Sequence, residues 1–190
     1  MTSSIVSLIK KQYHIYRHTT DVDAQGLFFS PTCMQTCRPN PPYCATSREQ
    51  IVKYLADARA GNIHSSSSDS SKPTPKPSKQ SRYTIRPLKV PAELEFGSHE
   101  VTTPIGYEPE ELVKKANEEK WVGMCVDLWD EGAVEGLFIK VNYWWREEDI
   151  RAGEETVEDV GGKGWRQCFH DIIYLGGREG WKPEGGEALE

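Results

Sequence analysis

Three long, aromatic-rich runs in the C-terminal half constrain the fold of this 190-residue chain more than any other feature. They are WVGMCVDLWDE (121–131), GLFIKVNYWWREE (136–148) and GWRQCFHDIIYLGG (164–177). β-branched and aromatic residues favour strands, and the glycine-containing segments between the runs favour tight connections between neighbouring strands. We therefore predict that the chain closes with an antiparallel meander of three strands.

The segments before the meander carry mostly helical patterns. Apolar residues recur at helical spacing near the N-terminus, Ser47 and Gln50 form a capping box, and Pro109 stands where a first helical turn begins. Expected in chain order are a helix over about 3–18, a short helix over 23–29, a strand over 32–37, a helix from Ser47 to Gly61, a strand around 83–86 and a helix over 109–119. Helices that precede a strand meander indicate an α+β fold.

We expect one domain over residues 1–180 and a polar tail over 181–190. Residues 62–82 are rich in Ser, Pro and Lys and contain a single aliphatic residue, so they cannot bury enough surface to offset the entropy of ordering. We interpret this segment as a disordered loop, and a tolerated loop expansion is favoured over a phosphorylation target.

Composition excludes several functional classes. The net charge is −6 and the pI is near 5.5, so the chain lacks the basic surface of a general nucleic-acid binder. We expect no signal peptide, no membrane span and a cytoplasmic location. The five cysteines are an odd number without a C-x-x-C pair, which favours reduced thiols. From this cysteine spacing and from an expected lack of a His-x₃-His arrangement we expect no metal site. Without a Gly-rich phosphate loop or a Ser/His/Asp pattern we also expect no cofactor.

The order of the predicted elements resembles the nuclear transport factor 2-like superfamily, which includes SnoaL-like cyclases, scytalone dehydratase and ketosteroid isomerase. The resemblance is greatest to fungal SnoaL-like proteins and implies a cone-shaped, curved antiparallel sheet packed on N-terminal helices, with a small-molecule pocket used in secondary metabolism. It covers most of the chain outside 62–82, 100–120 and the tail. The segments that carry it are the N-terminal amphipathic helix, TCRPNPPYC (36–44) with SREQIVKYL (47–55), and GWRQCFHDIIY (164–174).

Strand alternation predicts which residues line the cone. On the middle run, Val141, Tyr143 and Trp145 share the more apolar side, which we expect to face inward. For the last run, the family comparison favours the side with Trp165 and Asp171 as the inward one, and a regular strand then places His170 on the opposite face. The resulting predicted ligand contacts are Tyr13, Met124, Tyr143, Trp145, Gln167 and Phe169.

The resemblance also suggests a catalytic set. A desolvated Asp171 has a raised pKa and can act as a general base, while Tyr16 and Arg38 stabilise an oxyanion. Such a site supports a cofactor-independent isomerase, cyclase or dehydratase. Alternatively, an arginine holds Asp171 structurally, Arg38 pairs with a nearby carboxylate and Tyr16 is a core residue. The protein is then a non-catalytic ligand-binding or dimeric scaffold protein.

Outward-facing aromatic residues indicate a partner. Phe138 and Trp144 lie on the side of the middle run that faces away from the cone, where exposed aromatic area favours association. We therefore expect a homodimer through the outer face of the sheet.

Overall fold

The computed structural model describes residues 3–60, 81–130, 137–177 and 188–189. The predicted loop at 62–82, apart from its last two residues, and most of the tail at 181–190 lie outside these residues. No helix in the described part of the chain is long and apolar enough to cross a membrane.

The N-terminal third folds into two helices and an edge strand: α1 (Ser3–His18), α2 (Val22–Gly26) and β1 (Phe29–Cys37). Asp21 caps α2, and its Oδ1 accepts a hydrogen bond of 2.7 Å from the Ala24 backbone N–H. The second helix ends three residues before the predicted boundary, so the strand begins at Phe29 and contains Pro31. An edge strand tolerates a proline because one side of its backbone needs no ladder partner.

A short 3₁₀ helix, η1 (Pro41–Tyr43), leads into α3 (Arg48–Arg59). The predicted N-cap at Ser47 is confirmed, whereas the return bond from Gln50 goes to Thr46 rather than to Ser47, so the capping box is incomplete. Ser47 Oγ accepts a hydrogen bond of 3.4 Å from the Gln50 N–H, and Gln50 Oε1 accepts one of 2.7 Å from the Thr46 N–H. Its cap fixes where α3 begins.

The predicted meander is also confirmed. The remaining elements are β2 (Ser81–Pro87), α4 (His99–Thr102), the 3₁₀ helix η2 (Thr103–Ile105), α5 (Pro109–Glu118), β3 (Val122–Asp130), β4 (Leu137–Asp149) and β5 (Lys163–Gly177). The described strands form one sheet in the order β1-β5-β4-β3-β2, with antiparallel neighbours from β2 to β5 and with β1 added parallel to β5. Helices packed on a largely antiparallel sheet make this an α+β fold.

Each edge strand also pairs with a short segment. In β1, Gln35 and Ala45 exchange backbone hydrogen bonds of 2.8 and 2.9 Å. In β2, Tyr83 and Leu189 exchange bonds of 3.0 and 2.8 Å.

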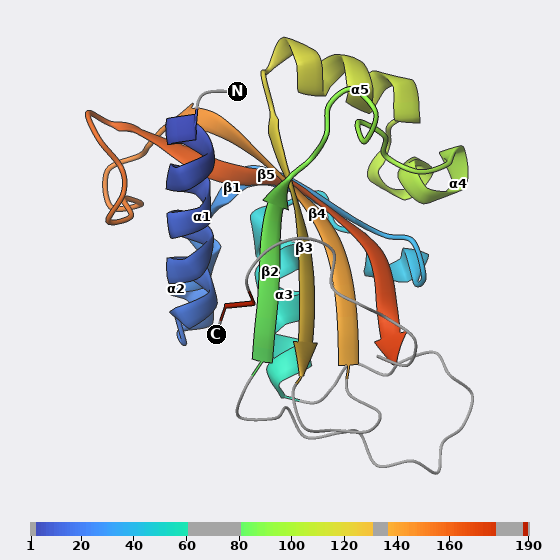
Figure 1. Cartoon of the computed structure of the whole chain (residues 1–190), viewed down its shortest axis with the longest axis horizontal. Helices are drawn as coiled ribbons and strands as arrows, with labels where there is room; N and C mark the ends of the chain where they lie inside the picture. The colour runs from blue at the N-terminus through green and yellow to red at the C-terminus, as the bar shows by residue number, and fades with distance from the viewer. Residues whose placement is uncertain (1–2, 61–80, 131–136, 178–187, 190) are drawn as a thin grey trace.

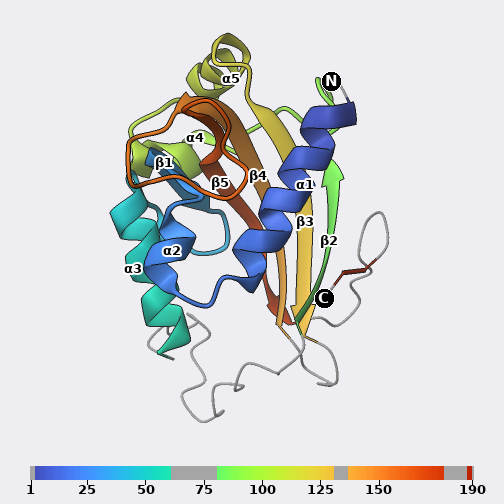
Figure 2. The same ribbon diagram turned by 90° about the vertical axis from the view of Figure 1, so that its left-hand side faces the viewer.

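Two hydrophobic cores lie on opposite faces of the sheet. Helices α1 and α3 cover the inner face, and α4 and α5 lie on the other side (Figures 1 and 2). The inner core is the interior of the cone and includes residues of α1, α3 and the strands. The outer core is built from the segment between β2 and β3 and the outward strand residues, chiefly Leu88, Phe96, Ile105, Leu112, Trp121, Trp144 and Phe169.

Gly123 allows the outer core to close. It stands opposite Trp144 on the neighbouring strand, and a Cβ at Gly123 would lie 2.6 Å from both the Trp144 ring and the Leu88 side chain. The indole therefore packs directly over the backbone of β3.

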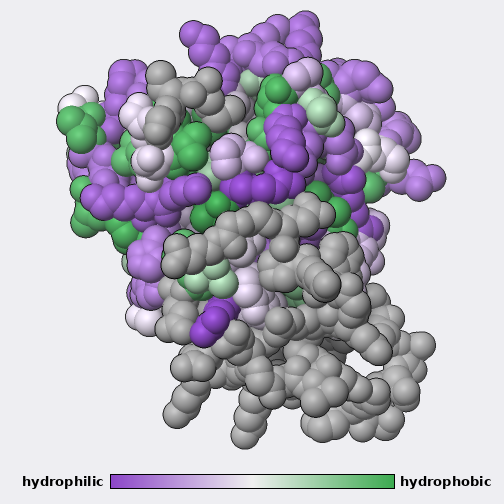
Figure 3. Space-filling model, viewed as in Figure 1, coloured by the Kyte–Doolittle hydropathy of each residue, from purple (hydrophilic) through white to green (hydrophobic). Residues whose placement is uncertain are grey.

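The aromatic residues predicted to form the dimer surface are covered by other residues of the same chain. Trp144 contacts the rings of Phe96 and Trp121, and Phe138 contacts that of Tyr174. Both Trp144 and Phe138 are 1% exposed, so the premise of exposed aromatic residues was wrong. The face in Figure 3 likewise shows hydrophobic residues in separate patches between hydrophilic ones. Dimer formation stays a prediction, and any such dimer must use other side chains.

Two β-bulges interrupt the alternation of β5. Trp144 pairs with Phe169 whereas Trp145 pairs with Gln167, so Cys168 is an extra residue; Ile173 is extra in the same way. Each extra residue reverses the faces that follow it. The regular strand assumed from the sequence is therefore wrong between the two bulges, where Phe169 and Asp171 face outward and His170 faces the cone.

Candidate functional site

The cone interior is an aromatic cluster centred on Tyr13 of α1. Its ring centroid lies 5.7 Å from that of Tyr16, 5.4 Å from Tyr143 and 6.3 Å from Trp145. These four residues and Met124, all of which were predicted to line the cone, belong to the inner core. Their exposed fractions are 8% or less, so side chains fill the interior.

Two glutamines bring unpartnered polar atoms into this cluster. Gln12 lies between Ile9 and Tyr16 on the inward face of α1, and Gln167 pairs with Trp145 across the sheet. Both are 1% exposed. Neither amide atom of Gln12 nor Oε1 of Gln167 has a hydrogen-bond partner among the described residues. Buried polar atoms are nearly always bonded, so these atoms mark a place where a polar group can be accommodated.

His170 takes the inward position that had been expected for Asp171. Its Nε2 lies 3.7 Å from Cys33 Sγ, and its Nδ1 lies 3.4 Å from Oε1 of Gln35. The Gln35 amide is oriented by donating its N–H to the Tyr43 carbonyl at 2.9 Å. Since an amide oxygen only accepts, Nδ1 carries the proton and Nε2 accepts from the thiol.

The buried His, Cys and Tyr side chains of the cone are neutral at pH 7. Burial lowers the pKa of His170 to about 3 and raises the pKa of the Cys33 thiol well above its ordinary value. Burial also raises the pKa of Tyr16 and, by a larger amount, that of Tyr143. The His, Cys and Tyr side chains of the cone therefore offer neutral hydrogen-bond donors and acceptors, while the guanidinium of Arg17, which lowers the pKa of Tyr16 and Tyr143, stays charged.

Asp171 and Arg38 form an ion pair on the outer side of the sheet. Arg38 Nε donates to Asp171 Oδ1 at 3.0 Å and its Nη2 to Oδ2 at 2.6 Å, while the Thr36 hydroxyl donates to Oδ1 at 3.1 Å. Nη2 also bonds Glu95 at 2.6 Å. Burial raises the pKa of the Asp171 carboxyl, and the bonds from Arg38 oppose that rise. This is the structural alternative considered above, and the second carboxylate that Arg38 pairs with is Glu95.

The proposed catalytic residues are therefore not brought together. Asp171 and Arg38 are bonded to each other, but Tyr16 packs on Phe28 and Phe29 in the inner core. A base at Asp171 and an oxyanion donor at Tyr16 lie on opposite faces of the sheet.

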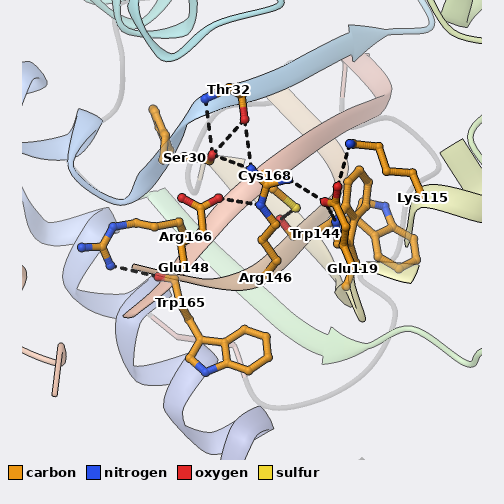
Figure 4. Close-up of polar contacts among 12 residues, drawn as sticks. Ser30, Thr32, Lys115, Glu119, Trp144, Arg146, Glu148, Trp165, Arg166 and Cys168 are labelled. Atoms are coloured by element: carbon orange, nitrogen blue, oxygen red, sulfur yellow. Dashed lines mark hydrogen bonds and ion pairs between the residues drawn. The ribbon is translucent and has the colours of Figure 1, made fainter. Parts of the chain in front are cut away.

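A second polar cluster surrounds Arg146, as Figure 4 shows. Arg146 bonds Glu119 and Glu148, each at 2.6 Å, and donates through Nη2 to the hydroxyls of Ser30 and Thr32 at 3.0 Å. Residues 30–33 form a bulge in β1, because Phe29 pairs with Gln167 and Met34 with Phe169. Arg146 thus ties this bulge to the end of α5.

A cleft of about 230 Å³ lies beside this cluster. It is lined by Ser30, Pro31, Thr32, Arg48, Arg146, Glu148, Asp149, Ile150, Arg151, Glu154 and Arg166. Carboxylates of the chain already bind three of its four guanidinium groups, those of Arg48, Arg146 and Arg166. The cleft is thus a polar junction rather than a preformed anion site.

The connection between β4 and β5, residues 150–162, is joined to three elements by ion pairs. Asp159 pairs with Arg166 of β5 at 2.6 Å, with both side chains less than 5% exposed. Glu154 pairs with Arg48 of α3 at 3.2 Å, and Glu158 with Lys11 of α1 at 2.9 Å. This loop therefore closes over the junction of α1, α3 and the sheet.

Sequence reasoning placed Gln12 on the inward stripe of α1 without assigning it a role, and it missed Cys33 and His170 as cone residues. Gln12 stands four residues before Tyr16, so its helical position already placed it inward. No sequence pattern indicates the bulge at Cys168, which turns His170 toward the cone and Asp171 toward the outer face. In the described residues, no group of three or more His, Cys, Asp or Glu side chains is placed to hold a metal ion.

A curved sheet packed around an N-terminal helix, with a further helical layer outside, defines a nuclear transport factor 2-like protein. A sequence model of the SnoaL-like domain matches residues 1–190, and the chain belongs to this family. Comparisons with curated proteins and with solved structures found no match.

Proposed function

We propose that the protein binds a small, largely apolar molecule carrying a hydroxyl or carbonyl group in the cone. The observation that carries this proposal is the buried, unpartnered amide of Gln12 together with the buried, unpartnered Oε1 of Gln167 in an aromatic core. An unbonded buried polar atom costs about 1–3 kcal/mol, so a ligand that bonds it recovers that free energy. The aromatic rings around the amides supply apolar contact area.

The geometry does not favour catalysis by Asp171. Its carboxylate is bonded to Arg38 and Thr36 and faces away from the cone. An isomerase, cyclase or dehydratase mechanism in the cone would instead have to use His170 and Tyr16. Burial leaves His170 a weak base, because its pKa is about 3. We therefore propose ligand binding rather than acid–base turnover.

A filled cone favours the second candidate, a non-catalytic scaffold. The inner side chains leave little free volume, so entry of a ligand requires side chains or the loop over 150–162 to move. The two candidates differ in one measurable property, which is saturable binding inside the cone.

The test compares 2-naphthol with naphthalene, which have the same aromatic body and differ by one hydroxyl. Binding is measured by the quenching of tryptophan fluorescence. Trp165→Phe, against the inner core, should reduce this signal, whereas Trp121→Phe, on the outer face, should preserve it. A hydrogen bond of about 0.5–1.5 kcal/mol predicts roughly two- to tenfold tighter binding of the naphthol. Gln12→Leu should remove that preference.

The scaffold candidate gives the opposite result. If neither compound shows saturable quenching up to about 1 mM, the binding free energy is weaker than about −4 kcal/mol and the ligand-binding proposal fails. Quenching that depends on Trp121 also contradicts it, because that residue lies outside the cone.

A further inference from the structure

His14 and His18 form a pair of imidazoles on the outside of α1. They are four residues apart, so they lie one above the other on the same helix face, and both are exposed. Their ring centroids are 4.1 Å apart. The expectation of no metal site rested on cysteine spacing and on the absence of a His-x₃-His arrangement. The second premise was wrong, because residues 14–18 are such an arrangement, a spacing that places two histidines on one face of a helix for metal binding.

The hydrogen bonds of the pair leave the same atom of each ring available. His18 Nδ1 lies 2.7 Å from the His14 carbonyl oxygen, which only accepts, so Nδ1 carries the proton and Nε2 has a free lone pair. His14 Nδ1 lies 2.9 Å from the Tyr83 hydroxyl oxygen. When that nitrogen donates to the phenol oxygen, Nε2 of His14 is free as well. Metal-binding histidines are oriented in this way by a bond from the second ring nitrogen.

We propose that His14 and His18 chelate a divalent first-row transition-metal ion through their Nε2 atoms, with water completing the coordination. Imidazole nitrogen suits Cu²⁺, Ni²⁺ and Zn²⁺, whereas Mg²⁺ and Ca²⁺ require oxygen ligands. The site lies outside the cone and does not depend on the function proposed for the interior.

Binding at this site would join the helix to the sheet. His14 is bonded to Tyr83 of β2, whose ring lies 5.3 Å from that of Tyr13 in the inner core. A metal held by the pair would therefore fix the last turn of α1 against the edge strand. Lys10, one turn before His14, is an exposed cation that reduces the affinity for a dication.

The test is calorimetric titration of the untagged full chain with Ni²⁺, Cu²⁺, Zn²⁺ and Mg²⁺. We expect one equivalent of ion to bind, most tightly for Cu²⁺ and not measurably for Mg²⁺. His14→Gln and His18→Gln should each weaken Ni²⁺ binding by more than about tenfold, because a single imidazole then lacks the second ligand on the helix. Tyr83→Phe keeps the ring and should weaken binding by about tenfold, because the hydrogen bond between the Tyr83 hydroxyl and His14 Nδ1 is lost.

His99→Gln is the matched control. His99 is an exposed helical histidine whose Nδ1 contacts Glu108 at 2.7 Å and whose Nε2 lies 3.2 Å from the Thr103 hydroxyl oxygen. Its replacement should leave the affinity unchanged within about twofold. The inference is overturned if the chain binds no Ni²⁺, or if either variant in α1 binds as tightly as the wild type. The inference is also overturned if His99→Gln weakens Ni²⁺ binding as much as the variants in α1 do. Circular dichroism of each variant excludes unfolding as the cause.

Discussion

Replacement of Asp171 by Asn tests whether its ion pair with Arg38 is structural. The Asp171 side chain is 0% exposed and accepts two bonds from Arg38 and one from Thr36. Asn has nearly the same shape but presents an NH₂ group to donors of the arginine. Breaking a buried pair costs about 3–5 kcal/mol. Arg38 is 23% exposed and still pairs with Glu95 in the variant, so we expect a loss of stability at the low end of this range, about 3 kcal/mol.

Urea denaturation followed by circular dichroism measures this change. In a chain of this length, 1 kcal/mol corresponds to about 2–4 °C in Tm, so thermal denaturation should show a decrease of about 6–12 °C. Glu95→Gln is the control: Glu95 is 53% exposed, and loss of such a pair costs at most about 1 kcal/mol. An Asp171→Asn variant within about 1 kcal/mol of the wild type would refute the structural assignment.

Three further predictions concern the inner core and the loop. Gln12→Leu should raise the free energy of unfolding by about 1–2 kcal/mol, because it removes unbonded buried atoms. Gln25→Leu should lower it by a similar amount, since the Gln25 amide bonds the Tyr16 carbonyl and Arg59; urea denaturation compares the two. The pKa of His170 is about 6.5 in the unfolded chain and about 3 in the folded protein, so below pH 6.5 the unfolded chain binds a proton that the fold does not. The free energy of unfolding should therefore decrease as the pH falls below 6.5, by about 2 kcal/mol at pH 5. His170→Gln should lack this slope, and an identical slope in the variant would contradict the assignment. Asp159→Asn should speed amide hydrogen exchange in residues 150–162, because it breaks the buried pair with Arg166; unchanged exchange would show that the pair does not hold the loop.

The fold was predictable because its signals are local. The helical spacing in α1, the N-cap at Ser47 and the three β-prone runs depend on residues close in sequence. Periodicity also placed Tyr13, Tyr16, Met124, Tyr143 and Trp145 in the cone correctly. Each of these assignments depends on a repeat of 2 or 3.6 residues that the structure maintains.

The candidate site was less predictable because it depends on irregularities. The bulge at Cys168 gives the inward position to His170 instead of Asp171, and nothing in the composition of the strand indicates this bulge. The burial of Trp144 depends on Phe96 and Trp121, which are distant from it in sequence. Contacts between remote segments cannot be derived from periodicity alone.

The pairing of both edge strands has a consequence for solution behaviour. Unpaired strand edges recruit other chains into intermolecular sheets, which is a common route to aggregation. Here Gln35 is bonded to Ala45 on one edge and Tyr83 to Leu189 on the other, and each edge strand contains a proline, Pro31 or Pro87, which cannot donate to an incoming strand. Truncation of the last residues would remove the Leu189 bonds and leave β2 as the edge most open to strand addition.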